Sequence, residues 1–180
     1  QNITPFTATF TFSEAVADFI VSDITLTNAT ASAFTTVSSS SYTALITPIA
    51  DGTITLNVNA NVAQDVAGNL NTAATQVSTE FDAILPTVTI QNVPENSNTA
   101  FTATFAFSEA VTGFEVGDIS LINATASAFA TVNSSTYTAL ITPSAQGLVT
   151  LNVGINVAQD SVGNFNIAAV PVVSLFDTTR

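Results

Sequence analysis

The chain has 180 residues, is 47% apolar, and carries a net charge of −12 because a single Lys or Arg stands against 13 acidic residues. So few cations cannot neutralise nucleic-acid phosphates or bind anionic membranes, and the absence of Cys and His excludes disulfides, zinc sites and Ser-His-Asp catalysis. We expect a protein that is not an enzyme, with a carboxylate-only hydrolase as the one catalytic alternative. Divalent cations are the natural partners of such a chain. No apolar run approaches the roughly 20 residues of a membrane helix, so no membrane insertion is expected in this segment.

An internal repeat divides the chain into two similar halves. PFTATFTFSEAV at 5–16 returns as AFTATFAFSEAV at 100–111, and other segments recur at the same offset of 95 residues. Each copy is too long for one rung of a solenoid and has the right size for a β-sandwich. The repeat predicts two domains, at 1–82 and 83–180.

Seven strands are expected in the second copy, because apolar residues alternate with polar ones and Asn, Ser, Gly and Pro cluster between the runs. In chain order they are Thr87–Gln91, Ala100–Phe107, Gly113–Asn123, Ser127–Val132, Thr136–Thr142, Leu148–Ala158 and Val172–Phe176. The fold class is therefore all-β, with two tandem seven-strand Ig-like antiparallel sandwiches. The alternating Phe residues of both copies are predicted to form the cores.

The first copy lacks a counterpart of the first strand, since PTVTI at 86–90 has no equivalent before Gln1. Two explanations stay open. Either the segment was trimmed together with any targeting sequence, or another chain supplies the strand by β-strand addition. The second explanation matters for function, because an open sandwich edge is a site of assembly.

The last long strand of each copy ends in a polar D-x-x-G-N turn. It stands at the end of Gly52–Asn69 and again at the end of Gly147–Asn164. The alternation in Gly147–Asn164 runs from Val149 to Val157, which predicts one continuous strand with a buried face. A carboxylate, a glycine and an amide gather directly after it, so the turn is the best candidate for chemistry.

Four motifs together resemble those of the bacterial Ig-like repeats found in large surface adhesins and biofilm-associated proteins. They are F-S-E-x-V-x-x-F, D-I-x-L-x-N, Y-T-A-x-I-T-P and D-x-x-G-N, and all four occur in both copies. The resemblance implies secreted, cell-surface-attached stalk modules, extracellular and adhesive, which calcium often stiffens at domain junctions.

Strand parity gives an independent reason to expect calcium. Alternate strand ends of an antiparallel sandwich lie at the same pole, so Asp82, Glu109 and the Asp160–Asn164 turn should converge at the junction between the domains. The expected ligands of the ion are Asp82, Glu109, Asp160 and Asn164. Converging carboxylates form the oxygen cage that Ca²⁺ prefers, and they would repel one another without a cation.

A structural interpretation of the same residues stays open. Asp160 can cap an Asx turn and Glu109 can accept bonds from its own loop. For Asp23 and Asp118 we expect a turn role rather than metal binding. Partial metal sites are expected at Glu14, Asp65, Asn69 and Asp177.

The predicted function is that of a structural extender, or stalk, which packs against neighbouring Ig-like repeats of the same protein. Two alternatives stay open. One is a subunit of an extracellular filament, in which identical chains complement each other with a strand. The other is an accessory module of a secreted hydrolase.

Overall fold

A computed structural model describes residues 5–179 of the chain. The chain forms two compact units, Gln1–Ala83 and Ile84–Arg180, and each unit is described by itself. Apart from two short 3₁₀ turns, the regular elements of the described residues are β-strands. Within residues 5–179 no helix has the length and apolar character needed to cross a membrane.

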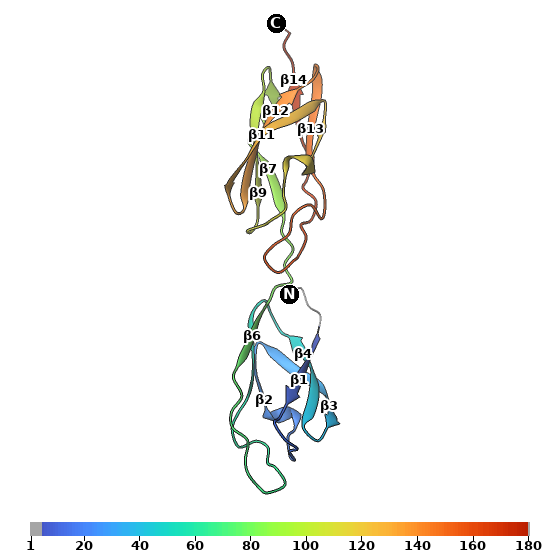
Figure 1. Cartoon of the computed structure of the whole chain (residues 1–180). Coiled ribbons are helices and arrows are strands. Elements are labelled where there is room, and N and C mark those ends of the chain that lie inside the picture. The colour runs from blue at the N-terminus through green and yellow to red at the C-terminus, as the bar shows by residue number, and fades with distance from the viewer. Residues whose placement is uncertain (1–4, 180) are drawn as a thin grey trace. The chain divides into compact units, whose positions relative to one another are not determined.

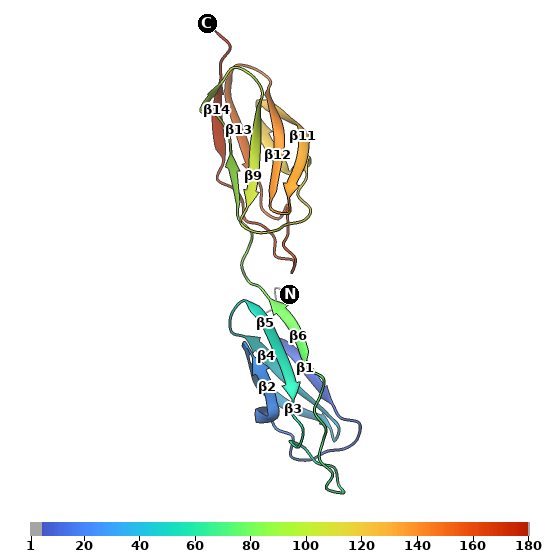
Figure 2. The same ribbon diagram turned by 90° about the vertical axis from the view of Figure 1, so that its left-hand side faces the viewer.

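The second unit is a sandwich of two four-stranded sheets (Figure 1). One sheet has the order β11-β12-β9-β7, and Figure 2 shows β9, β12 and β11 side by side. The other has the order β10-β13-β14-β8, in which only the β14–β8 pair is parallel. The strands are β7 Val88–Gln91, β8 Asn96–Ser97, β9 Phe101–Phe107, β10 Ile119–Ile122, β11 Ala124–Asn133, β12 Thr136–Pro143, β13 Gly147–Val153 and β14 Val172–Phe176. The predicted all-β, Ig-like class is confirmed, with the two-residue strand β8 as an unpredicted addition.

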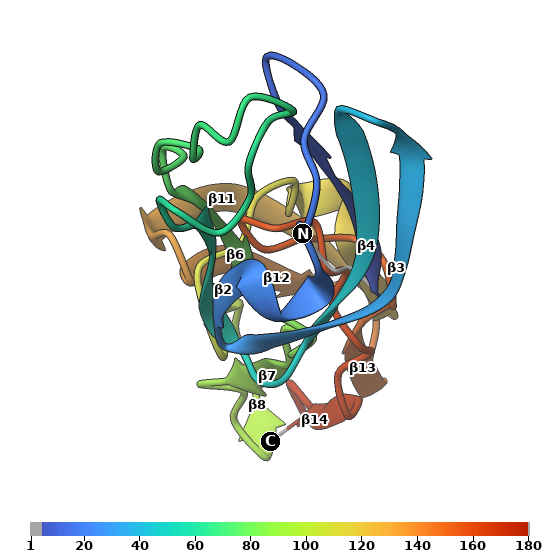
Figure 3. The ribbon, with the colours of Figure 1, turned by 90° about the horizontal axis from the view of Figure 1, so that it is seen from below.

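The first unit has the same plan with three strands in each sheet. The sheet orders are β1-β4-β3 and β2-β5-β6, and Figure 3 shows the β3–β4 hairpin clearly. The strands are β1 Phe6–Thr11, β2 Ile24–Thr27, β3 Ala29–Ser38, β4 Ser41–Pro48, β5 Gly52–Val58 and β6 Val77–Phe81. Among residues 5–179, no segment pairs with β1 as β7 pairs with β9.

Alternation along the strands builds a core in each unit. In β12 the buried residues Tyr137, Ala139 and Ile141 alternate with less buried ones, which are threonines and Leu140, so one face of the strand packs inward. Phe114 lies in the middle of the aromatic residues of this core, with its ring centroid 5.2 Å from that of Tyr137. Phe19 takes the same place in the first unit. The alternating Phe residues therefore belong to the cores, as predicted.

Each unit contains one tyrosine, which is buried and hydrogen-bonded. The Tyr137 hydroxyl donates to the Val111 carbonyl at 3.0 Å, and the Tyr42 hydroxyl donates to the Val16 carbonyl at 2.9 Å. The chain has no Trp. Tyrosine fluorescence therefore reports on one unit alone when the other tyrosine is replaced by Phe.

The prediction of one long strand over 148–158 is wrong beyond Val153, where β13 ends. The alternation continues in the sequence, but Ile155 is 62% exposed and Asn156 has a left-handed φ of 61°. The chain leaves the direction of β13 because the side chain of Asn166 binds the backbone of Val157 and Ala158. Its Oδ1 accepts from the amides of Val157 and Ala158 at 2.9 Å each.

The predicted strand at Gly113–Asn123 is also too long. Its first half is irregular and contains the 3₁₀ turn η2, Val116–Asp118, before β10 begins. Asp118 Oδ2 accepts from the Glu115 amide at 2.8 Å, and Asp23 does the same for Ile20. Short local bonds of this kind compete with a strand. The turn role expected for Asp23 and Asp118 is what the structure shows.

Candidate metal centre

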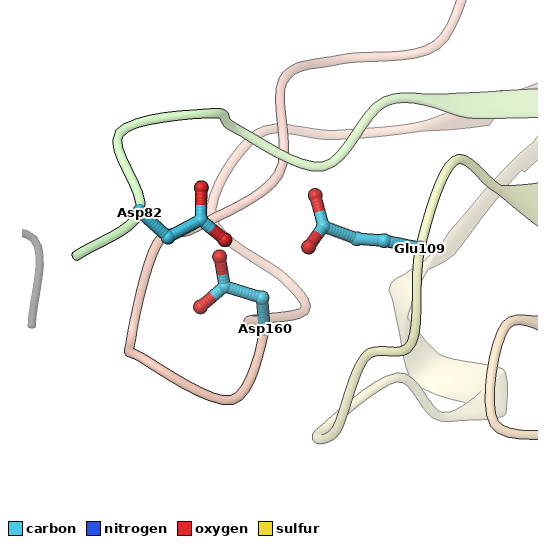
Figure 4. A group of neighbouring side chains, drawn as sticks. All are labelled: Asp82, Glu109 and Asp160. Carbon is cyan, nitrogen blue, oxygen red and sulfur yellow. The ribbon is translucent and has the colours of Figure 1, made fainter. Parts of the chain in front are cut away.

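Three carboxylates from separate parts of the sequence lie close together. Asp82, Glu109 and Asp160 each offer an oxygen, and these oxygens all lie within 4.8 Å of one another. Figure 4 shows the three side chains pointing toward one another. Among residues 5–179 this is the one group of three or more acidic side chains close enough to share an ion.

The D-x-x-G-N turn after β13 positions Asp160. Its Oδ1 accepts from the amides of Val162, Gly163 and Asn164 at 2.8, 2.8 and 2.9 Å. The Asn164 side-chain amide donates to the other oxygen, Oδ2, at 2.8 Å. Gly163 has a φ of 96°, a conformation that glycine adopts without strain. The sequence motif is therefore a carboxylate-capped turn, as the structural interpretation expected.

Burial and hydrogen bonding act on the charge of Asp160 in opposite directions. Asp160 is 4% exposed. Burial raises the pKa of its carboxyl, but the bonds donated by Asn164, Val162 and Gly163 lower it by more, so the pKa lies below the ordinary value of 3.8. Asp160 is therefore an anion at neutral pH although it is buried.

The segment after β6 carries Asp82 and then joins the second sandwich. The Asn164 side chain donates to the Ile84 carbonyl at 3.2 Å, and the Ile167 amide donates to the Pro86 carbonyl at 3.0 Å. Pro86 is completely buried. Asp82 precedes this anchored stretch by two residues, and Glu109 follows the end of β9; both are half-buried.

This arrangement suits a hard cation. Carboxylate oxygens are the ligands that Ca²⁺ prefers, and the flexible coordination of Ca²⁺ accepts an irregular set. Like charges so close together raise the free energy of the cluster when no cation is present. Of the four residues predicted to converge, the structure brings the three carboxylates together, and Asn164 joins them through its bonds to Asp160 and to the Ile84 carbonyl.

The partial sites have different surroundings. Asp65 accepts from the amide and side chain of Asn69 at 2.8 Å each, and the side-chain bond is the main reason for its lowered pKa. Asn69 and Glu14 are exposed, where the equivalent Asn164 is buried. Asp177 is exposed and accepts from Thr179, which lowers its pKa.

Sequence reasoning missed a structural asparagine next to the candidate site. Asn166 accepts from two amides, as described above, and donates to the carbonyls of Gly154 and Ile167 at 2.8 Å each. Asn71 makes the equivalent four bonds in the first unit. The signal was an Asn two positions after D-x-x-G-N in both copies. Its role depends on backbone groups up to twelve residues away, which the motif does not reveal.

The family comparison agrees with this fold. The sequence model of the bacterial Ig-like domain matches residues 2–81 and 82–174. The chain therefore belongs to the bacterial Ig-like domain family and contains two of its repeats in tandem. No curated protein matches the sequence.

Solved structures of bacterial surface proteins show a similar fold. The Escherichia coli adhesin FdeC has a TM-score of 0.43 and 15% identity over 85% of this chain and 51% of its own. Invasin, a bacterial integrin-binding protein, has a TM-score of 0.40 and 18% sequence identity, over 99% of this chain and 37% of its own. InvD of Yersinia pseudotuberculosis has a TM-score of 0.39 and 20% sequence identity, over 97% of this chain and 53% of its own. The chain thus spans about half or less of the length of these relatives.

Proposed function

We propose that the chain is an extender segment of an extracellular bacterial surface protein and has no enzymatic activity. The observation that carries the proposal is the tandem repetition of one Ig-like sandwich, with about two-thirds of the aligned positions identical between the copies. Repetition of a compact module adds length to the chain in similar steps. The scarcity of Lys and Arg leaves trypsin-like proteases almost no cleavage sites, which suits an exposed position.

A stalk carries load, so its modules should unfold one at a time when the chain is pulled. We expect two separate unfolding events in single-molecule force spectroscopy of the chain between two handles. Each event should release about 300 Å of chain, because roughly 90 residues extend by at most about 3.3–3.6 Å each. Smooth extension without two such events would contradict a load-bearing role.

Within this function, Ca²⁺ is the proposed ligand of Asp82, Glu109 and Asp160. The 4.8 Å cluster supports the proposal, as does the ionised state of the buried Asp160. An ion there would offset the mutual repulsion of the three carboxylates. Metal binding in an extracellular module is typically weak, with dissociation constants near 10⁻⁴–10⁻³ M.

Calcium should raise the melting temperature of the second unit. At about 10 mM Ca²⁺ and a dissociation constant near 10⁻⁴ M, mass action gives about 2.7 kcal/mol. For a domain of this size that is on the order of 10 °C. The melting temperature should be measured by the fluorescence of Tyr137 in a Tyr42→Phe background, with Ca²⁺ and with a chelator.

Glu109→Gln is the informative variant, because it removes a charge from the cluster without touching the turn bonds of Asp160. It should remove most of the calcium effect. Glu14→Gln, the equivalent change in the first unit, should leave the effect intact. If the melting temperature of the unsubstituted chain is the same with Ca²⁺ and with chelator, the calcium proposal is wrong.

A further inference from the structure

An open groove in the first unit runs along the edge of β1 that no strand within residues 5–179 pairs with. Its volume is about 620 Å³, and its lining comes from β1, the loop after it, β5 and the 65–79 segment. The apolar part of the lining includes Phe6, Phe10, Phe12 and Val16, and the polar part includes Asn69 and Asn71. All the lining residues lie in the first unit. We call this feature the β1 groove.

The second unit shows what the same surface looks like when it is covered. Several residues that line the β1 groove are half-buried or exposed, whereas their counterparts 95 positions later are buried. Such pairs include Phe10 and Phe105, Phe12 and Phe107, Val16 and Val111, Asn71 and Asn166, and Ala74 and Ala169. The two surfaces have nearly the same sequence, so the difference comes from what lies over them.

The cover in the second unit is the stretch from Ile84 to β7. Pro86 is completely buried and Val88 is 5% exposed, while Ile90 packs against the core. β7 runs antiparallel to β9, with Val88 opposite Phe107 and Ile90 opposite Phe105. The stretch is also held by backbone bonds, including one from the Ser108 amide to the Thr87 carbonyl at 2.9 Å.

The free edge of β1 offers the same backbone groups. The Phe12 amide donates toward β4, to the Ser40 carbonyl at 2.9 Å, just as the Phe107 amide donates to Ser135. Amides alternate in direction along a strand, so those of Thr11 and Ser13 point to the open side. Ser13 is the counterpart of Ser108. An incoming strand would therefore find both the apolar pockets and the backbone donors that β7 uses.

We propose that the β1 groove binds an extended segment of the Pro-x-Val-x-Ile type, supplied by the junction of another Ig-like repeat. The segment pairs antiparallel with β1, its Val lies opposite Phe12, and its Ile lies opposite Phe10. This is β-strand addition, in which the backbone gives affinity and alternate side chains give specificity. The inference goes beyond the proposed stalk role and does not depend on calcium.

A disulfide trap tests both binding and register, because the chain contains no cysteine of its own. The probe is a synthetic peptide with the sequence of residues 84–92 and Thr89→Cys. In β7 Thr89 pairs with Ala106, whose counterpart is Thr11. Directly paired residues have Cα atoms about 5.5 Å apart, within the range of a disulfide. The Thr11→Cys chain should therefore form a mixed disulfide with this peptide in a glutathione redox buffer.

A matched pair of variants fixes the register. The Thr9→Cys chain should react at least ten times more slowly with the Thr89→Cys peptide, and rapidly with a Gln91→Cys peptide, because Gln91 pairs with the counterpart of Thr9. Thr9 and Thr11 are both exposed, so neither change disturbs the core. Unlabelled peptide 84–92 should compete with the reaction, whereas a Val88→Asp, Ile90→Asp peptide should compete at least tenfold less well.

Three results would overturn the proposal. One is equal trapping of both cysteine positions by both peptides, since that indicates random collision. The second is a stable dimer of the unsubstituted chain that excludes the peptide, because a second copy would then occupy the groove. The third is a failure to trap either peptide while Tyr42 fluorescence, measured in a Tyr137→Phe background, shows that the first unit is folded.

Discussion

Replacing Asn166 by alanine should destabilise the second sandwich by about 4 kcal/mol or more. The side chain is 1% exposed and satisfies two amides and two carbonyls. Alanine leaves these backbone groups without a partner in a place that water reaches poorly, and each such group costs about 1–3 kcal/mol. The effect should be measured by urea unfolding, followed by Tyr137 fluorescence in a Tyr42→Phe background.

Asn71→Ala in the first unit is the matched control. Asn71 makes the same four bonds, but it is half-buried and lines the β1 groove. Water can replace part of what is lost there, so we expect about 1–2 kcal/mol. If both substitutions lower the free energy of unfolding by the same amount, burial of the asparagine does not determine how much it stabilises its unit. Adding the peptide 84–92 should move the Asn71→Ala result toward that of Asn166→Ala if the groove binds it.

The strands that the sequence predicts best are those with one buried face. β9 differs from its prediction by one residue, because its buried Ala103, Phe105 and Phe107 alternate with less buried residues and so report directly on a sheet with a core on one side. β14 has the predicted bounds, although its buried residue is Ser174 and both Val173 and Leu175 are exposed. The end of β13 could not be predicted in the same way. The apolar residues keep their spacing through Val157, but side-chain bonds from Asn166 turn the backbone there. A pattern of hydropathy carries no information on such bonds.

The candidate site likewise has one feature that the sequence predicts and one that it does not. Strand parity predicts that Asp82, Glu109 and Asp160 converge, because parity depends only on the number and direction of strands. Parity gives no information on how deeply each residue is buried. DSVGN and DVAGN are nearly the same motif, yet Asp160 is buried and Asp65 is half-exposed. This difference in burial arises because the stretch that begins at Ile84 covers the Asp160 turn. No such stretch lies over the Asp65 turn among the described residues of the first unit.

Asp160→Ala should destabilise the second sandwich by about 3 kcal/mol even in the presence of a chelator. The substitution leaves the amides of Val162, Gly163 and Asn164 without their acceptor, in a turn whose first and last residues are buried. This loss is separate from any effect of calcium, which Glu109→Gln isolates. Asp65→Ala in the first unit should cost less, because Asp65 is less buried and its turn is open to water. Urea unfolding with chelator present, read by Tyr137 or Tyr42, measures both.

Acid provides a second measurement of the same carboxylate. The pKa of Asp160 is lowered in the folded chain, so its contribution to stability is complete above its ordinary pKa of 3.8 and is lost as the pH falls through the lower, folded value. The unfolding free energy of the second unit should therefore decrease below about pH 4, and Asp160→Asn should flatten that decrease. An unchanged acid profile in Asp160→Asn would show that the turn does not depend on the charge of this residue. The carboxylate of Asp160 would then have a role other than stabilising the turn, and binding of the proposed Ca²⁺ would be the first such role to test.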